Sequence, residues 1–323
     1  MLFCTGCDDW FFEEKPGEWE YVTEFPGEGR EKAVNFTISD TVYIGLGYAF
    51  RWNDSYDITD TVYFNDLWKF VPSMDTWKEL SDLPFGNITD GLGFSIDGKG
   101  YTILNLDNKN TVWEYNPSED TWYKLSEFPG FLRKGAIGFT LYDKIYFGLG
   151  SAYDTIIHQR IDATDLWMYD PELNTWEEKA LFPGPPRNNA AAFTIHNKAF
   201  ICTGGEPPFN FDSMRDSWEY DPDLNTWTKK KDFGGYPRQS AVAFSLNNKG
   251  YVGTGTDYPF PGSQMADFWE YNYETNSWKQ IAKHPGYTSN ATGVVIHNVC
   301  YTGLGNHYFI DYKTSVYKLT INN

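Results

Sequence analysis

The sequence predicts an all-β fold made of one repeated blade, and three observations carry this prediction. One motif recurs along the chain, and its fullest copy, DLWMYDPELNTWEEKALFPGPPR at 165–187, joins an Asp-x-Trp-x-Tyr run to a turn and a second Trp. The second Trp recurs at spacings of 45, 54, 51 and 51 residues, at Trp77, Trp122, Trp176, Trp227 and Trp278. This period is too long for helical solenoids and lies in the range of propeller blades. Finally, no segment longer than a turn has helical periodicity, whereas period-two alternation bounded by Asn, Asp, Gly and Pro is frequent, as strands require.

Each full unit contains four expected strands. In the third unit, residues 134–141 alternate small and apolar side chains, and a turn at 142–144 leads into IYFGLG. A loop, the run DLWMY, a DPELN turn and TWEEKALF complete the unit. The units fall at about 31–84, 90–129, 133–183, 187–233, 238–285, and 290–323 joined with 19–25. The sequence therefore predicts six blades.

The two ends of the chain each carry part of one blade. Residues 19–26, WEYVTEFP, match only the last strand of the repeat, and residues 291–319 supply three strands without a Trp-bearing fourth. We expect 19–25 to pair with 315–319 and complete the last blade, which would close the ring and remove both open sheet edges. Residues 1–18 are then an N-terminal tether, and 19–323 form a single propeller.

These repeats resemble the kelch family. The similarity lies in a Gly pair or near-pair after strand two (GLG at 45–47, 148–150 and 303–305, TGG at 203–205, GTG at 253–255), an aromatic residue in strand three and Trp in strand four. The second unit departs from the pattern, because TILNL at 102–106 replaces the Gly pair and its loop is short. The resemblance implies a six-bladed kelch β-propeller. It implies no single activity, because one fold carries many functions.

Composition limits the partners. The net charge of −18 repels nucleic acid and anionic membranes, and no apolar run is long enough to span a bilayer. The aromatic content of 19% recurs mostly at repeated positions, which assigns it first to packing. Cys202 and Cys300 occupy equivalent strands of blades that are not neighbours, so we expect two small buried side chains and no disulfide.

The N-terminal LFCTGCDD resembles the end of a bacterial lipoprotein signal, in which small residues precede the lipid-bearing cysteine. This resemblance implies a lipid on Cys7 and a place in the bacterial cell envelope, as an outer-membrane or surface lipoprotein. The membrane would then be a partner only through that anchor. The alternative is an unmodified terminus without fixed structure, because Cys4 stands where Leu is usual.

The strand order separates two faces of the ring. Short, similar turns, such as Ser39-Asp40 and the DPELN type, lie on one face. Loops of varied length lie on the other, and variable loops on a rigid frame are where function is normally carried. These loops are 48–65, 105–110, 151–164, 206–215, 256–266 and 306–314.

Arginine is expected to gather at that loop-rich mouth. Links into strand one bring Arg30, Arg133, Arg187 and Arg238 there. With Arg215 on a loop, they predict a site for an anionic or polar ligand. Stacking or polar side chains for the same ligand are Trp52, Tyr258, His158 and His307. The alternative is structural: each arginine pairs with a carboxylate or caps loop carbonyls of a neighbour.

Catalytic patterns are sparse, and no metal or cofactor is expected. Neither Gly-x-Ser-x-Gly nor His-Glu-x-x-His occurs, and the aspartates at 54, 57 and 60 lack the Gly and Glu of an EF-hand. The sequence therefore predicts a binding module for a glycan or a protein segment. A second hypothesis is a sugar-processing enzyme, because GGE at 204–206 with Arg215 is similar to kelch-type sialic-acid epimerases (mutarotases). That similarity implies Glu206 as the acid/base and arginines that hold the sugar carboxylate.

Overall fold

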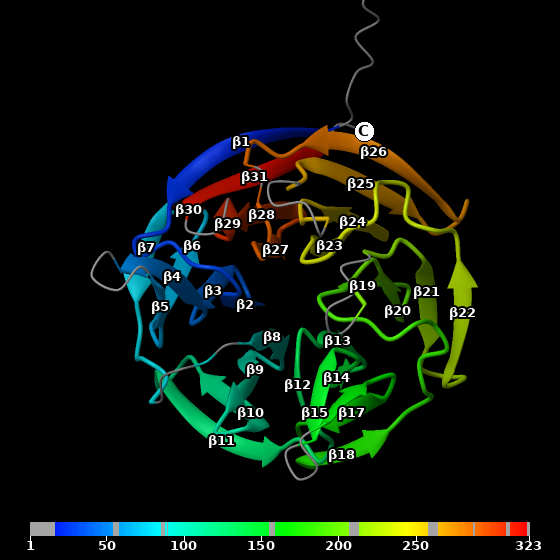
Figure 1. Cartoon of the computed structure of the whole chain (residues 1–323). Helices are drawn as coiled ribbons and strands as arrows, with labels where there is room; N and C mark the ends of the chain where they lie inside the picture. Colours follow the sequence, from blue (N-terminus) through cyan, green and yellow to red (C-terminus); the bar gives the residue numbers. More distant parts are fainter. Residues whose placement is uncertain are drawn as a thin grey trace, which may run out of the picture.

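The protein is a closed ring of six four-stranded antiparallel sheets (Figure 1). The computed structural model describes residues 17–53, 58–84, 88, 90–154, 159–206, 213–257, 264–286, 288–307 and 311–321. Each blade runs outward from the channel as a meander, so consecutive strands pair and the fourth strand forms the outer wall. The prediction of an all-β, six-bladed propeller is confirmed.

The first three blades are built alike. Blade 1 contains β2 (Val34–Ile38), β3 (Thr41–Gly45), β6 (Leu67–Val71) and β7 (Thr76–Glu79). Blade 2 contains β8 (Gly91–Ile96), β9 (Lys99–Leu106), β10 (Lys109–Asn116) and β11 (Thr121–Glu127). Blade 3 contains β13 (Ile137–Leu141), β14 (Lys144–Gly148), β17 (Leu166–Asp170) and β18 (Thr175–Glu178).

The last three blades follow the same order. Blade 4 contains β19 (Ala191–Ile195), β20 (Lys198–Cys202), β21 (Ser217–Asp221) and β22 (Thr226–Lys230). Blade 5 contains β23 (Val242–Leu246), β24 (Lys249–Gly253), β25 (Asp267–Asn272) and β26 (Ser277–Lys283). Blade 6 contains β27 (Thr292–Ile296), β28 (Val299–Gly303), β31 (Ser315–Ile321) and the N-terminal β1 (Gly17–Glu24).

The N-terminal strand closes the ring, as the sequence predicts. β1 pairs antiparallel with β31, with Trp19 opposite Leu319 and Glu24 opposite Ser315. One further backbone hydrogen bond, from Phe25 to the carbonyl of Thr314 at 2.8 Å, continues this pairing past the strand. Blade 6 therefore takes three strands from one end of the chain and one from the other, so neither end leaves an open sheet edge.

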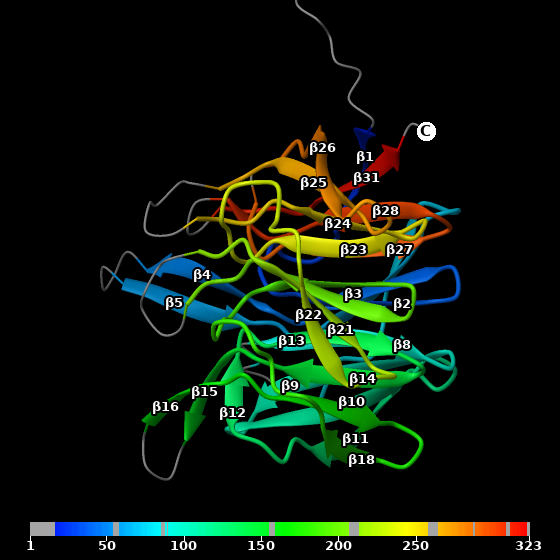
Figure 2. The ribbon, with the colours of Figure 1, turned by 90° about the vertical axis from the view of Figure 1, so that its right-hand side faces the viewer.

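Additional short strands rise from the loop-rich face, as Figure 2 shows. β4 (Tyr48–Asn53) and β5 (Ile58–Tyr63) form a hairpin, and β29 (Asn306–His307) pairs with β30 (Asp311–Tyr312). β12 (Leu132–Lys134), β15 (Ser151–Asp154) and β16 (Gln159–Asp162) form a third small sheet. The DPELN-type turns lie at the opposite face. The predicted separation of variable loops from short turns is thus what the strand order produces.

Aromatic side chains pack one blade against the next. In four seams the outer-strand Trp meets, edge to face, the Phe that ends the previous blade's outer strand, with ring centroids 4.9–5.3 Å apart. These pairs are Phe25–Trp77, Phe128–Trp176, Phe182–Trp227 and Phe233–Trp278. Edge-to-face pairs add about 0.5–1.5 kcal/mol to the free energy of burial. The repeated Trp residues therefore serve packing, as predicted.

The turns of the opposite face are fixed by one polar residue each. In blade 4, Asn225 adopts a positive φ of 51°, which asparagine tolerates better than most residues. Its side-chain oxygen accepts hydrogen bonds from the Tyr220 hydroxyl at 2.8 Å and from the backbone of Ala180 in blade 3 at 2.9 Å. Asn276 repeats both contacts in blade 5. This face is a structural framework, which explains why its turns are so similar in sequence.

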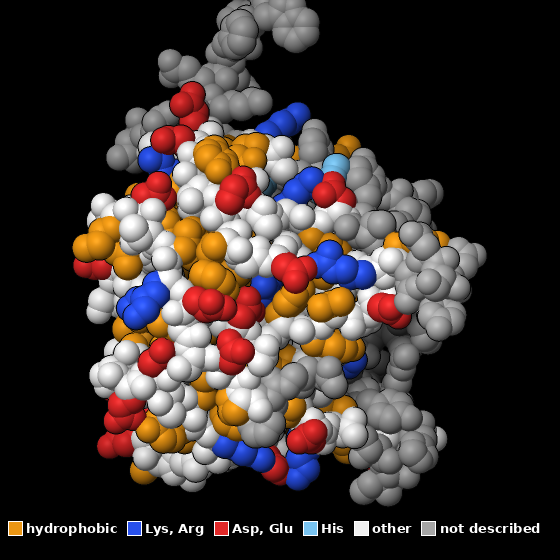
Figure 3. Space-filling view, turned by 90° about the vertical axis from the view of Figure 1, so that its left-hand side faces the viewer, with side chains coloured by type: hydrophobic (Ala, Val, Ile, Leu, Met, Phe, Trp, Pro, Cys, Tyr) orange, Lys and Arg blue, Asp and Glu red, His pale blue; other side chains and the backbone are white. Residues whose placement is uncertain are grey.

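The surface beside blade 1 has no dominant character. Acidic, basic and apolar side chains are interspersed over the outer wall in Figure 3.

Cys202 and Cys300 are fully buried with free thiols, as expected. No helix long and apolar enough to cross a membrane occurs in the described ranges.

Candidate functional site

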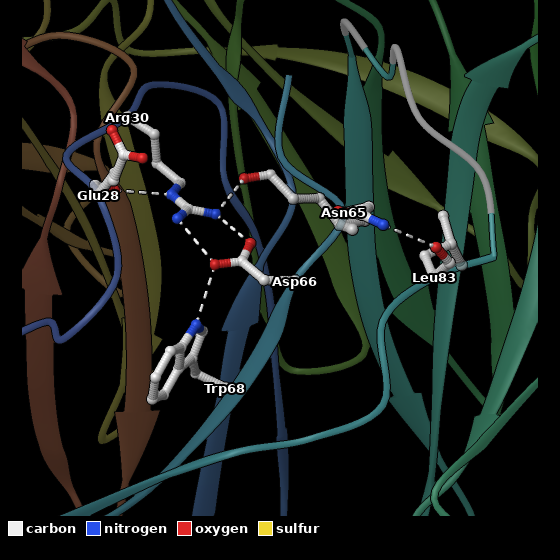
Figure 4. Close-up of polar contacts among 7 residues, drawn as sticks. Glu28, Arg30, Asn65, Asp66, Trp68 and Leu83 are labelled. Atoms are coloured by element: carbon white, nitrogen blue, oxygen red, sulfur yellow. Dashed lines mark hydrogen bonds and ion pairs between the residues drawn. The ribbon is translucent and has the colours of Figure 1, made fainter. Parts of the chain in front are cut away.

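Four of the arginines predicted to ring the loop-rich mouth are buried inside the blades. Arg30, Arg133, Arg187 and Arg238 each have an exposed fraction of 0–1%. Arg133 donates two hydrogen bonds to the carboxylate of Asp165, at 2.7 and 2.8 Å, and one to the carbonyl of Leu149 at 3.3 Å. Arg30 makes the corresponding contacts with Asp66, which also accepts a hydrogen bond from the Trp68 indole at 2.9 Å (Figure 4).

Each of these arginines also contacts the preceding blade. The Arg187 guanidinium carbon lies 4.9 Å from the centroid of Phe182, which ends the outer wall of blade 3, while its ion pair to Asp216 lies in blade 4. Arg238 repeats this arrangement with Phe233 and Asp267. We call this unit of Arg, Asp and the preceding Phe a seam latch, because it joins two blades.

The seam latch corrects the prediction that Arg133, Arg187 and Arg238 bind a ligand. Their guanidinium groups donate to protein acceptors and are closed to solvent, as in the structural alternative that the sequence left open. Burial by itself raises the pKa of the Asp216 carboxyl, but the hydrogen bond and charge of Arg187 outweigh it and hold that pKa below its usual range.

Two blades lack the seam latch, and each of them lacks both its arginine and its aspartate. In blade 2 the positions of Arg and Asp are held by Ile88 and Thr111, and in blade 6 by Thr288 and Ser315. All four of the other blades keep both partners. A lone arginine or a lone aspartate would leave a buried charge unpaired, which is strongly destabilising. The joint loss is therefore what a structural ion pair requires.

The channel mouth itself is ringed by a different set of residues. They stand two positions after the latch position in each blade: Lys32, Asp90, Gly135, Asn189, Ser240 and Asn290. A cavity of about 340 Å³ opens between them, and the small side chains that follow, among them Ala136, Ala190 and Ala241, line its wall. This volume lies at the lower end of the range for small-molecule sites.

A ring of backbone hydrogen bonds fixes this mouth. Asn189 donates its N–H to the carbonyl of Gly135, Ser240 to Asn189, Asn290 to Ser240, and Lys32 to Asn290, at 2.8–3.1 Å. Between blades 2 and 3 the Asp90 carboxylate replaces the carbonyl and accepts from Gly135 N–H at 3.2 Å. Because the backbone polar groups are used in this ring, polar contacts to a ligand would have to come from the side chains that line the cavity, among them Lys32, Asp90 and Asn189.

Lys32 extends across the mouth. Its ammonium group donates to Asp90 in blade 2 at 2.6 Å and to the side-chain oxygen of Asn189 at 3.3 Å. Asn189 belongs to blade 4, which stands opposite blade 1 in the ring (Figure 1). Both charged side chains are about one-fifth exposed, so the pair is partly shielded from water. The mouth thus presents a cation and a carboxylate side by side.

A buried carboxylate lies next to this pair. Glu31 accepts hydrogen bonds from the side-chain amides of Asn290 and Asn306, each at 2.8 Å. Burial raises the pKa of Glu31 above its usual range, and hydrogen bonds from Asn290 and Tyr48, with the charge of Lys32, oppose that rise. Glu31 therefore fixes blade 6 against blade 1 beneath the mouth.

The other predicted residues fall in different places. Trp52, on β4, is 53% exposed and is not among the residues that line the mouth cavity. His307, on β29, lies 3.2 Å from the Asp311 carboxylate. Glu206 is exposed at the start of the loop that follows β20, and Arg215 lines a groove between blades 4 and 5. Tyr258, His158 and Cys7 lie outside the described residues.

Sequence reasoning missed Lys32, Asp90 and Glu31. A signal existed, since each stands at a fixed offset from the latch position, but each occurs in one blade only. A pattern that looks for repeated residues discards such exceptions. Within the described ranges no cluster of three or more His, Cys, Asp or Glu residues is arranged to hold a metal ion.

Comparisons with known proteins place the chain among kelch propellers. No protein-family model matches it. It is 21% identical over 283 residues to N-acetylneuraminate epimerase of Salmonella typhi, which covers 81% of this chain and 64% of that protein. The same enzyme of Pasteurella multocida is 26% identical over 77% of this chain and 61% of its own length. The chain therefore spans less than two thirds of the epimerases that it matches.

Two further similarities agree on the fold. Kelch-like protein 25 of Xenopus tropicalis is 33% identical over 132 residues, which is 41% of this chain and 20% of that protein. A solved structure of YjhT superposes with a TM-score of 0.75 at 17% identity, and covers 94% of this chain and 99% of its own. At this level of identity the structural match establishes the architecture alone.

Proposed function

We propose that this chain, which is a kelch-repeat β-propeller, is a carbohydrate-recognising protein that holds a small sugar in the loop-side mouth of its channel. The observation that carries this proposal is the polar ring over a small-residue cavity. A sugar presents hydroxyl groups that both donate and accept, together with an apolar C–H face. Lys32 donates, Asp90 accepts, Asn189 and Asn290 do both, and the alanines of the wall suit the C–H face.

The cavity size also favours a sugar over a protein segment. A volume of about 340 Å³ suits one or two sugar units and is small for a folded or extended polypeptide. The ion pair of Lys32 and Asp90 is already formed and shielded, so neutral hydroxyl groups can bind to it without a further charge being buried. We therefore propose a glycan end or a free monosaccharide as the ligand.

The proposal is tested by calorimetric titration of the purified protein with a panel of free hexoses, N-acetylhexosamines and N-acetylneuraminate. Asp90→Asn should weaken the binding of the best sugar at least tenfold, since one charged hydrogen bond contributes about 1.5–3 kcal/mol. Asp97→Asn is the matched control, because Asp97 is exposed in a turn of the same blade at the opposite face. Equal binding by wild type and Asp90→Asn, or no binding of any sugar, would contradict the proposal.

A second candidate is a sugar-converting enzyme, and the geometry of Lys32 and Asp90 favours it. Interconversion of anomers removes the proton of the anomeric hydroxyl and places a proton on the ring oxygen, so the ring opens to a carbonyl and closes on its other face. An ammonium group and a carboxylate 2.6 Å apart in one cavity supply an acid and a base. Several relatives are also N-acetylneuraminate epimerases.

The enzyme hypothesis assigns competing roles to two carboxylates. The family resemblance implies Glu206 as the acid/base, whereas the cavity contains Asp90. Proton NMR of freshly dissolved N-acetylneuraminate would measure anomer exchange with the wild type, Glu206→Gln and Asp90→Asn. Loss of exchange in Asp90→Asn alone supports the cavity, and loss in Glu206→Gln alone supports the resemblance. Exchange at the uncatalysed rate with wild type leaves binding as the function.

A further inference from the structure

A second opening lies outside the channel, in the seam between blades 4 and 5. It is a groove of about 580 Å³, and it is lined among others by Arg215, Tyr236, Met265, Trp269, Gln280 and Lys283. Tyr236 is 77% exposed, and Arg215, Gln280 and Lys283 are exposed as well. The groove therefore combines aromatic surface with two cationic side chains at the rim of the molecule.

The local sequence explains why this seam is open. At the position after the outer strand, five repeats carry proline, at Pro26, Pro84, Pro129, Pro183 and Pro285. Blade 4 carries Gly234 instead, so no pyrrolidine ring occupies that place. A Cβ on Gly234 would lie 2.7 Å from two ring carbons of Trp269, so the indole lies directly against the glycine backbone. The glycine lets the groove reach the Trp269 ring.

A β-bulge shapes the other wall. The pairing of β25 with β26 shifts register between Phe268 and Trp269, and β26 continues to Lys283. Bulges re-aim the side chains that follow them. Here the shift buries Ile281 and Ala282 and leaves Gln280 and Lys283 on the groove wall.

Within the part of the chain that the structure describes, the two cationic side chains of the groove form no ion pair. Among the arginines whose side chains the structure describes, Arg215 alone makes no ion pair, and Lys283 makes none with any described carboxylate. The one carboxylate of the lining, Asp267, already accepts two hydrogen bonds from Arg238 and one from the Trp269 indole. In a chain of net charge −18, two unpaired cations around one groove favour an anion.

We propose that the seam between blades 4 and 5 is a second binding site, which takes a carboxylate-bearing sugar unit of an acidic glycan. Arg215 and Lys283 would bind the carboxylate, and the faces of Tyr236 and Trp269 would pack against the sugar ring. The site is separate from the channel mouth and does not depend on the function proposed for it.

An acidic peptide is the competing ligand, and the wall of the groove disfavours it. Extended peptides gain affinity by adding to a regular sheet edge, with main-chain hydrogen bonds. The edge here is β26, and its bulge at Ile281 interrupts the regular ladder where the groove lies. Ring faces and side-chain cations remain, which suit a sugar acid.

The test is a calorimetric titration with an α-1,4-linked galacturonate hexamer and with its fully methyl-esterified form, which keeps the shape and removes the charge. The wild type should bind the charged hexamer, more weakly as salt rises, and should bind the ester at least tenfold more weakly. Arg215→Gln with Lys283→Gln should weaken binding of the charged hexamer at least tenfold.

The matched control is Lys231→Gln with Lys279→Gln, which removes the same charge from exposed positions of blades 4 and 5 outside the groove lining. It loses the same overall charge as the test variant but should bind within about twofold of wild type, because neither lysine lines the groove. Asp90→Asn should also leave this binding unchanged, which separates the groove from the channel mouth. Equal binding of the ester, full affinity in the Arg215 and Lys283 variant, no binding of the hexamer, or tighter binding of an oligo-aspartate would each overturn the proposal.

Discussion

Replacing Arg187 by isoleucine tests the seam latch most sharply, because blade 2 supplies a natural version of the repaired site. Arg187 donates to Asp216 at 2.7 Å and to the carbonyls of Thr203 and Pro185 at 3.0 and 3.2 Å, and stacks on Phe182. Its removal leaves Asp216 largely enclosed with its charge uncompensated. Breaking a buried ion pair from one side costs about 3–5 kcal/mol, so Arg187→Ile should lower the free energy of unfolding by that amount.

The double variant Arg187→Ile with Asp216→Thr recreates the Ile88 and Thr111 pair of blade 2. It removes both charges, so most of the lost stability should return, since exchange of a whole buried pair for uncharged groups is often close to neutral. Urea unfolding followed by circular dichroism measures the free energy of unfolding of the single and the double variant. The dependence of this free energy on urea concentration should stay that of the wild type. A single variant within about 0.5 kcal/mol of wild type would refute the latch. A double variant no more stable than the single one would refute the coupling.

The latch also has a predicted pH dependence. The pKa of the Asp216 carboxyl is lower in the folded protein than in the unfolded chain, so the folded state is favoured when the group is ionised. This contribution is fully present above the unfolded pKa of about 4 and is lost as the pH falls through the lower folded value. Arg187→Ile should therefore destabilise the protein strongly at pH 7 and much less in strong acid.

Three further predictions concern the ends of the chain and the last seam. Deletion of residues 1–25 removes β1 and should lower stability by several kcal/mol, because it strips Trp19 from the core and opens a sheet edge; a melting temperature equal to wild type would contradict closure. His284 replaces the seam phenylalanine beside Trp19, and burial lowers its pKa to about 4. Because the unfolded chain binds a proton at this group first, the free energy of unfolding should fall by about 3 kcal/mol as the pH is lowered from 6.5 to 4. His284→Phe should flatten this pH dependence in urea titrations, and an unchanged pH profile would count against the assignment. When the chain is expressed behind a bacterial lipoprotein signal peptide, Cys7 should carry lipid and bring the protein to membranes, whereas Cys7→Ser should not. Mass spectrometry that finds an unmodified wild-type cysteine would contradict the anchor.

The fold could be predicted because each blade repeats the same physical requirements. Alternation, turns that contain Gly, Asn or Asp, and Trp in the outer strand recur in every unit, so an error in one blade is corrected by the others. Closure followed from two fragments, one at each end, that match complementary parts of a blade.

The site could not be predicted in the same way. A repeated arginine that opens strand one is compatible with both a ligand site and a buried ion pair, and only burial separates the two. The aspartate partners were already visible in the Asp-x-Trp runs, and their joint loss with arginine in blades 2 and 6 was the available signal. Lys32 and Asp90 are unlike their repeats and come together only when the ring closes, so spacing along the chain does not reveal their contact.

The most direct test of the proposed sugar site is a titration of the isotopically labelled protein with the best-binding sugar, followed by the side-chain amide signals of asparagine in NMR spectra. Asn189 and Asn290 line the channel mouth, whereas Asn225 and Asn276 lie in the turns of the opposite face and serve as internal references. The account predicts saturable shifts of the Asn189 and Asn290 amides, absent in Asp90→Asn, with the two reference amides unmoved. Shifts confined to Asn225 and Asn276, or no shift at Asn189 and Asn290 when the sugar is bound, would contradict it.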